Sequence, residues 1–273
     1  GSFGEAKAFN MMIDVSLGPD KSDRGYLRPE TAQSAYLNYY REFNLLRQKL
    51  PLGLAIIGRA YRNEISPRQG LYRLRELVQA ELQIFFDEQM FKPDLSDFSG
   101  SRINVVLYTT GKLESLTPEE LVSRGYPAFY VYHMCLIDRF YRKILGVLDT
   151  KLRFLEKGGD DKAFYNKIHM DIELEVESWG GFKEVGGLHF RDDYDLTSHS
   201  KGSNKSFLVK SEGREFMPNV LELSFGVDRN VWAQLDLFFN NSDGRQLLSL
   251  KPYIAPYTAA VLPLQNDEQI NGK

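Results

Sequence analysis

The stretch that decides the fold is Gly58-Arg59-Ala60-Tyr61-Arg62-Asn63-Glu64-Ile65-Ser66-Pro67-Arg68-Gln69-Gly70-Leu71-Tyr72-Arg73-Leu74-Arg75-Glu76. Its arginines flank a polar turn between two apolar, strand-like segments. Because side chains alternate along a strand, Arg62 and Glu64 are expected on one face, and Arg73 and Arg75 on one face after the turn. The pattern predicts a hairpin that brings these charges together.

Clustered arginines allow two interpretations. Guanidinium groups repel one another unless an anion lies among them, and their planar forks match phosphate and carboxylate oxygens. The hairpin could therefore bind an anionic ligand. The alternative is a solvated, charged hairpin without a ligand, because most charged side chains are at the surface.

Outward from the hairpin, short strand-like stretches outnumber helices. Strands are expected at 9–15, 54–61, 82–86, 104–109, 172–178, 207–209 and 219–223. Helices are expected at 30–46, from the cap Thr117 to a stop at Gly125, at 129–148 and at 227–239, with loops at 94–101 and 199–206. This order predicts an α+β fold with a central, mostly antiparallel β-sheet flanked by helices.

Composition limits the function classes. The 273 residues are 42% hydrophobic, enough to bury a large core, and the net charge of -3 argues against coating nucleic acid through an overall positive field. The lone Cys135 excludes an internal disulfide framework, which favours a reducing, cytoplasmic location. His133, His169, His189 and His199 show no zinc spacing, and His133 is expected in the core. No apolar run predicts a membrane span.

Four blocks carry a family resemblance. The hairpin resembles motif 2 of the class II aminoacyl-tRNA synthetases, and specifically the signature of the glycyl enzymes. Residues 25–33 and 218–229 resemble an upstream family signature and motif 3. Residues 184–196 are similar to a fourth block, except that His189 and Phe190 replace an alanine and an aspartate. The chain thus resembles the catalytic core of glycyl-tRNA synthetases of the archaeal and eukaryotic-like homodimeric type.

The resemblance implies an ATP site. Arg62 would hold the α-phosphate and the amino-acid carboxylate, while Arg73 and Arg229 would hold the γ-phosphate; Arg62 and Arg229 are the expected catalytic residues. Glu64 would accept from the adenine amino group, and Arg229 would stack on the purine opposite a family phenylalanine, here Leu77. The full set expected to bind ATP is Arg62, Asn63, Glu64, Arg73, Leu77, Glu184 and Arg229, with Glu184 also expected to hold ATP-bound Mg²⁺.

The resemblance also implies a pocket for glycine. Its expected residues are Glu30, Glu81, Arg191, Glu222 and Ser224. Several carboxylates around one ammonium leave little room for a Cβ, so larger amino acids would be rejected sterically. Taken singly, Glu81 could be a surface charge, Ser224 a turn cap, and Arg191 half of an ion pair with Asp193 or Asp195.

The expected organisation is a catalytic domain at 1–250, lacking a recognisable motif 1 and carrying a helical insertion around 110–160. Residues 251–273 are expected to form the first strand and linker of a truncated anticodon-binding domain. The implied function is ATP-dependent activation of glycine and its transfer to tRNA(Gly), with ATP as substrate, Mg²⁺, no structural zinc, no membrane partner and a homodimer in the full-length protein. The alternative is a catalytically silent module that binds nucleic acid or another subunit.

Overall fold

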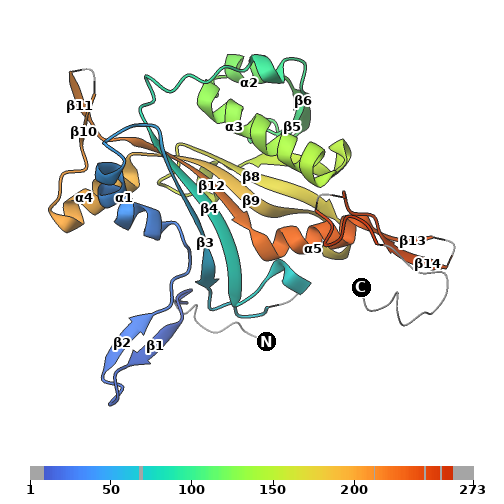
Figure 1. The fold of residues 1–273 in the computed structure, drawn as a ribbon, viewed down its shortest axis with the longest axis horizontal. Coiled ribbons are helices and arrows are strands. Elements are labelled where there is room, and N and C mark those ends of the chain that lie inside the picture. Colours follow the sequence, from blue (N-terminus) through green and yellow to red (C-terminus); the bar gives the residue numbers. More distant parts are fainter. Residues whose placement is uncertain (1–8, 68–69, 212, 243, 253, 261–273) are drawn as a thin grey trace, which may run out of the picture.

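One eight-stranded sheet forms the centre of the computed structural model, which describes residues 9–67, 70–211, 213–242, 244–252 and 254–260 (Figure 1). The strand order is β3-β4-β12-β9-β8-β7-β5-β6, and every neighbouring pair is antiparallel except β5 and β7. The strands are β3 (Leu52–Tyr61), β4 (Glu76–Phe86), β5 (Ile103–Val106), β6 (Leu113–Leu116), β7 (Leu152–Glu156), β8 (Ile168–Val176), β9 (Gly181–Asp192) and β12 (Asn219–Gly226). The expected α+β class and mostly antiparallel sheet are confirmed.

The apolar face of the sheet packs under helix α3 (Ala128–Arg139), which crosses it in Figure 1. Alternation along the strands sends Leu188 and Phe190 of β9 to this face. Phe129 of α3 meets Phe190 edge-on, with ring centroids 5.0 Å apart, and contacts Phe86 at 4.6 Å. Burying each of these side chains contributes roughly 1.5–3 kcal/mol. This core fixes the strands whose other face carries the site.

The opposite face is covered at one end by α1 (Gln33–Leu45) and α4 (Tyr194–Ser203). Tyr39 of α1 packs on Phe85 of β4 with centroids 4.5 Å apart. The two helices lie side by side at the left of Figure 1, where α1 contacts β3 and α4 contacts β9. The central strands β4, β12, β9 and β8 therefore keep a polar stretch of this face beside the two helices.

Two helical predictions are confirmed in detail and one is corrected. Helix α2 (Pro118–Ser123) begins at Thr117, whose side chain and that of Glu120 form a reciprocal capping box. Helix α5 (Val227–Phe238) follows β12 directly. The expected helix at 129–148 is α-helical only to Arg139, where α3 ends; it continues as a π-helical segment, η3 (Phe140–Leu145), and stops three residues before its expected end.

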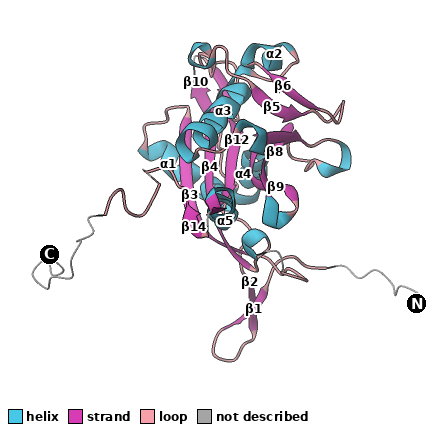
Figure 2. Cartoon of the chain, turned by 90° about the vertical axis from the view of Figure 1, so that its right-hand side faces the viewer, coloured by secondary structure: helices cyan, strands magenta, loops and turns pink. Residues whose placement is uncertain are grey.

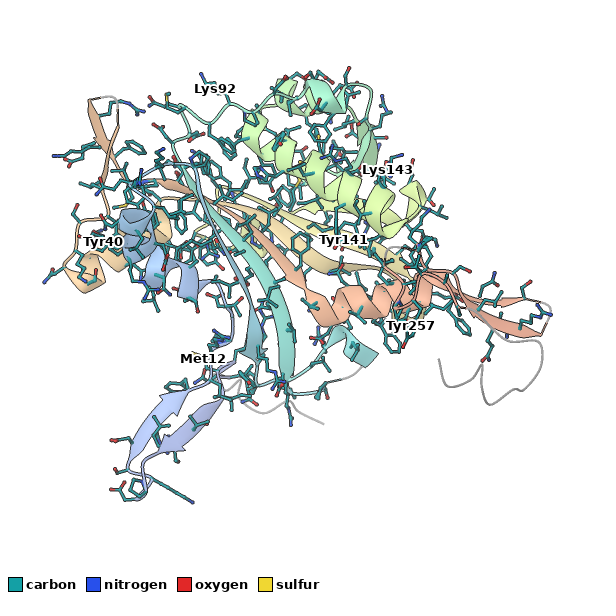
Figure 3. All side chains as sticks on the ribbon, viewed as in Figure 1. Met12, Tyr40, Lys92, Tyr141, Lys143 and Tyr257 are labelled. Atoms are coloured by element: carbon teal, nitrogen blue, oxygen red, sulfur yellow. The ribbon has the colours of Figure 1, made fainter. Side chains whose placement is uncertain are left out.

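Contacts between η3 and α5 tie the helical layer to the site. Tyr141 lies between them (Figure 3) and donates its hydroxyl to Asn230 Oδ1 at 2.6 Å. Asn230 in turn donates to the carbonyls of Val185 and Gly226 at 2.9 Å each. The start of α5 is therefore held against β9 and β12.

Three hairpins project from the sheet: β1 (Asp14–Leu17) with β2 (Asp23–Tyr26), β10 (Val209–Ser211) with β11 (Arg214–Phe216), and β13 (Phe239–Ser242) with β14 (Arg245–Leu248). Figure 2 shows the first of them standing clear of the sheet. None of the helices in the described part of the chain is long and apolar enough to cross a membrane.

Several expected boundaries are wrong. The strand expected at 9–15 begins only at Asp14, and α4 runs to Ser203 through part of the loop expected at 199–206. Strand β9 was not expected at all. Residues 251, 252 and 254–260, where the first strand and linker of a second domain were expected, form turns and irregular chain, while 261–273 lie outside the described residues. The division into a catalytic and a second domain stays a prediction.

Candidate active site

Two rows of polar side chains cross the open face of the central strands. In the first row Gln83 of β4 pairs with Glu222 of β12, Glu222 with His189 of β9, and His189 with His169 of β8. In the second row Glu81 pairs with Ser224, Ser224 with Gly187, and Gly187 with Asp171. Cross-strand partners are neighbours on one face, so residues distant in sequence become one polar surface.

One pocket opens over these rows, and all of the predicted site residues except Asn63 line it. They are Glu30, Arg62, Glu64, Arg73, Leu77, Glu81, Glu184, Arg191, Glu222, Ser224 and Arg229. Asn63 is not brought to the pocket: its backbone N–H donates to Met11 O at 2.8 Å and its amide to Asn10 O at 3.3 Å. The neighbouring Met12 is labelled beside the end of β3 in Figure 3.

The arginine hairpin differs from the expected pair of long strands. Strand β3 ends at Tyr61 and β4 begins only at Glu76, so the charged residues between them lie on a connection that contains the short helix η1 (Gly70–Tyr72). Arg62 N donates to Arg75 O at 2.9 Å, and Arg75 Nε to Glu64 O at 3.1 Å. These bonds join the segment after β3 to the segment before β4 without forming regular β-sheet pairing.

Arg62 and Arg229 are held by backbone carbonyls from other elements. Arg62 Nε donates to Pro29 O at 3.1 Å. Arg229 donates to Tyr72 O and Glu184 O at 3.1 Å each, and also pairs with Glu184 Oε2 at 3.1 Å. The Arg229 guanidinium lies 4.5 Å from the centroid of the Tyr72 ring. Tyr72 was not predicted as a site residue, although its position among the arginines of the hairpin could have indicated one.

Glu222 is buried and fully engaged within the chain. Its Oε1 lies 2.6 Å from His189 Nδ1, and its Oε2 accepts from Gln83 Nε2 at 2.8 Å and from Arg191 Nη1 at 3.0 Å. Burial opposes ionisation of Glu222, but the hydrogen bond to His189 and the charge of Arg191 outweigh it and lower its pKa to about 2. Glu222 is therefore an internal carboxylate anion.

Arg191 forms an ion pair with Asp195, which was the alternative to its predicted role in binding glycine. It binds Asp195 through two nitrogens, at 2.7 and 2.9 Å, while its third contact is Glu222. Burial favours the neutral form of Arg191, but the charge of Glu222 and the bond to Asp195 raise its pKa above the ordinary value. Its side chain is only 5% exposed, so it is a structural cation at the pocket wall.

Glu81 is the pocket carboxylate with an open acceptor. Ser224 Oγ donates to its Oε1 at 3.2 Å, and its buried Oε2 has no well-formed hydrogen bond among the described residues. Burial and the neighbouring charge of Glu222 raise the pKa of Glu81 to about 7, and hydroxyl groups offset them only in part. The alternative that Glu81 is a surface charge is wrong, because only 5% of the residue is exposed.

His189 occupies space that depends on a glycine. A Cβ at Gly187 would lie 2.5 Å from His189 Nε2, which is too close for any side chain. The ring also meets His169 edge-on with centroids 4.3 Å apart. The sequence marked His189 as a departure from the family block but did not indicate that it bonds to Glu222. By contrast, the expected core position of His133 is confirmed, since it is 5% exposed and bonded to Phe129 O.

The described residues contain no group of three or more His, Cys, Asp or Glu side chains that could hold a metal ion. The arrangement combines arginines at one side of a pocket with carboxylates at the other. Such a pocket can hold a polyanion next to a small cation and stabilise charge that develops between them.

A family model described as tRNA synthetase class II core domain (G, H, P, S and T) matches residues 15–238. The chain therefore belongs to the class II tRNA synthetase core domain family. It is similar to proteins named glycine–tRNA ligase: 31% identical to that of Pyrococcus furiosus over 99% of this chain and 62% of the relative, and 33% identical to that of Archaeoglobus fulgidus over 100% of this chain and 61% of the relative. The chain spans about three fifths of the length of these relatives.

Proposed function

We propose that the protein is a glycine–tRNA ligase whose pocket forms glycyl-adenylate. The observation that carries the proposal is the meeting, in one pocket, of Arg62, Arg73 and Arg229 with Glu81 and Ser224. An oxygen of the glycine carboxylate would attack the α-phosphorus of ATP, and pyrophosphate would leave. The terminal ribose hydroxyl of tRNA(Gly) would then attack the activated carbonyl and displace AMP.

Positioning and charge stabilisation supply the catalysis in this proposal. Arg62 would stabilise the charge that develops at the α-phosphate, and Arg73 and Arg229 would hold the γ-phosphate. The purine would lie on Arg229, whose plane Tyr72 already supports. Glu64 would accept from the adenine amino group. Mg²⁺ would reach the site on the phosphates of ATP with Glu184 as one oxygen ligand, which suits an ion that is usually bound through one or two carboxylates.

The glycine ammonium would bind to Glu81 and Ser224. Glu81 Oε2 is a buried acceptor without a well-formed bond to the described residues, so an ammonium there would satisfy it and favour its ionised form. Glu222 would contribute negative potential while it holds Arg191 in place. The tight setting around the ammonium would exclude larger amino acids.

The experiment is glycine-dependent exchange of pyrophosphate into ATP by the protein at its natural length. Arg62→Ala should lower exchange by roughly 10²-fold or more, since it removes a donor to the reacting phosphate. Arg59→Ala is the matched control: Arg59 lies on β3 three residues before Arg62, is exposed, and pairs with Glu76 outside the pocket. Equal exchange by both variants would contradict the assignment of Arg62.

A specific observation favours the second candidate, a catalytically silent module. Both oxygens of Glu222 and most donors of Arg191 are bound within the chain, so neither is free for a substrate. Absence of exchange with any of the twenty amino acids, in a protein that still binds tRNA, would favour this candidate. Exchange with glycine would exclude it.

A further inference from the structure

A second cavity adjoins the active-site pocket. It has a volume of about 430 Å³ and lies where the loop before β8 meets the junction of β9 and α4. The bond from Lys167 N to Phe190 O joins the loop before β8 to the last residues of β9. Tyr165 and Arg191 line both cavities, so they form a shared wall. Anything bound in the second cavity lies next to the proposed adenylate.

Three aromatic rings line this cavity. The Arg191 guanidinium lies 4.3 Å from the centroid of the Tyr165 ring, and Tyr165 stacks on Tyr194 with centroids 6.1 Å apart and planes inclined by 29°. Phe164 meets both tyrosines edge-on, at 5.2 and 5.4 Å. Yet Phe164 is 81% exposed and Tyr194 is 44% exposed. Clustered rings with open surface are typical of a binding site rather than of a core.

Exposed cations and a buried acceptor lie among the polar groups around these rings. Lys167 and Lys201 are exposed cations at the rim, and Lys167 lies 3.6 Å from Asp192. Asn166 is 5% exposed, and its Oδ1 has no hydrogen-bond partner in the part of the chain that the structure describes. A buried acceptor of this kind normally has a donor, such as a ribose hydroxyl or the amino group of a base.

Rings, cations and an open acceptor together match single-stranded nucleic acid. Unpaired bases stack on aromatic side chains, lysines contact the backbone, and polar groups bind base edges and the 2′-hydroxyl. Asp192 and Asp193 also line the cavity. Their charge disfavours a phosphate-rich duplex, whereas carboxylates accept readily from bases and sugars. The site therefore suits a few unpaired nucleotides.

We propose that this aromatic cleft, defined by Phe164, Tyr165, Asn166, Tyr194 and Lys201, binds the unpaired 3′ end of the RNA that accepts glycine. The proposal rests on the proposed function, because it assigns the cleft to the second substrate of the same site. The terminal base stacks on the open face of Phe164, which is 81% exposed. The shared wall of Tyr165 and Arg191 separates that base from the glycine pocket.

The test uses Phe164 because it is exposed and does not line the glycine and ATP pocket. The protein at its natural length is titrated with a short RNA hairpin whose unpaired 3′ end carries 2-aminopurine, a base whose fluorescence is quenched by stacking. Phe164→Leu keeps apolar bulk without a ring, and Phe164→Tyr keeps the ring. We expect quenching by the wild type and Phe164→Tyr, and about tenfold weaker binding by Phe164→Leu.

Kinetics separate this proposal from the function on which it rests. Phe164→Leu should raise the KM for RNA in aminoacylation about tenfold and leave pyrophosphate exchange unchanged. The cleft proposal is overturned if the wild type does not quench the probe, if Phe164→Leu binds RNA as the wild type does, or if exchange falls together with RNA binding. If the cleft binds a peptide instead, RNA binding will not respond to Phe164. Absence of exchange in the wild type counts against the proposed function alone, because the quenching assay needs no catalysis.

Discussion

The arginine side of the pocket and its carboxylate side hold their charges in different ways. Arg73 is exposed, and Arg229 rests on carbonyl groups and a ring. On the other side Arg191, Asp195 and Glu222 form a network of ion pairs whose side chains are at most 7% exposed. An open side can admit a large, solvated polyanion. Burying the charges of the closed side has a desolvation cost, but their ion pairs keep the geometry of this side fixed for a small ligand.

The difference separates stability from function within one pocket. Charges in the closed network are needed for folding, because each has lost water and depends on its partners. Arg73 on the open side is exposed to water, so its removal should affect ligand binding far more than the free energy of unfolding. Matched substitutions on the two sides of the pocket test this distinction.

The largest effect is expected from Arg191→Met. This change leaves Glu222 and Asp195 buried without their shared cation, so the free energy of unfolding should fall by about 3–5 kcal/mol. The control is Arg73→Met on the exposed side, which should change it by less than about 0.5 kcal/mol. Urea titration measures both. Similar losses for the two variants would show that the closed network has no special role.

A smaller, pH-dependent effect is expected from Glu81→Gln. The pKa of Glu81 is raised from 4.5 to about 7, so the folded state disfavours the ionised form. The destabilisation of the folded state by the Glu81 carboxylate is absent below pH 4.5, where the group is protonated in the folded and the unfolded state. It is complete above pH 7, where the group is ionised in both states. The variant should therefore gain stability relative to the wild type as pH rises through this window, by about 3 kcal/mol at most.

The control for this effect is Glu76→Gln, an exposed carboxylate on the same strand. Its stability difference from the wild type should be nearly independent of pH over the same window. Denaturant midpoints measured between pH 4 and 8 give both curves. A pH-independent difference for Glu81→Gln would mean that the carboxyl titrates normally. Glu222 shows the opposite dependence: its lowered pKa gives a stabilising contribution that is complete above about pH 4.5 and is lost as pH falls from there to about 2.

Local chemistry explains which parts of the fold the sequence predicted. Thr117 and Glu120 form a cap within four residues, and the passage from β12 to α5 follows a turn at Gly226. Strand β9 escaped prediction because its glycines and charged residues hide the alternation of a strand. A Cβ at position 187 would collide with the His189 ring, and that contact exists only after folding.

The site shows the same limit. Motif resemblance identified the residues that line the pocket, but not which of their atoms are free. Glu81 and Glu222 were indistinguishable as expected glycine ligands, yet their pKa values move in opposite directions. The causes are the hydrogen bond of Glu222 to His189, 33 positions away, and the charge of Arg191, 31 positions away. Pairings between distant strands decide such differences, and local sequence patterns do not encode them.

The smallest effect is expected from Leu77→Phe on the open side. Leu77 is half-buried and lines the same pocket as Arg229, so an aromatic ring at this position would face the purine that is proposed to rest on Arg229. A stacking contact contributes about 1 kcal/mol, so the KM for ATP in pyrophosphate exchange should fall about fivefold while the KM for glycine stays unchanged. Leu77→Met, which keeps the volume without the ring, is the control. Because the open side tolerates change, the free energy of unfolding should alter little in either variant. If Leu77→Phe instead raises the KM for ATP, or destabilises the protein as a buried substitution would, then this end of the pocket is as closely packed as the carboxylate side.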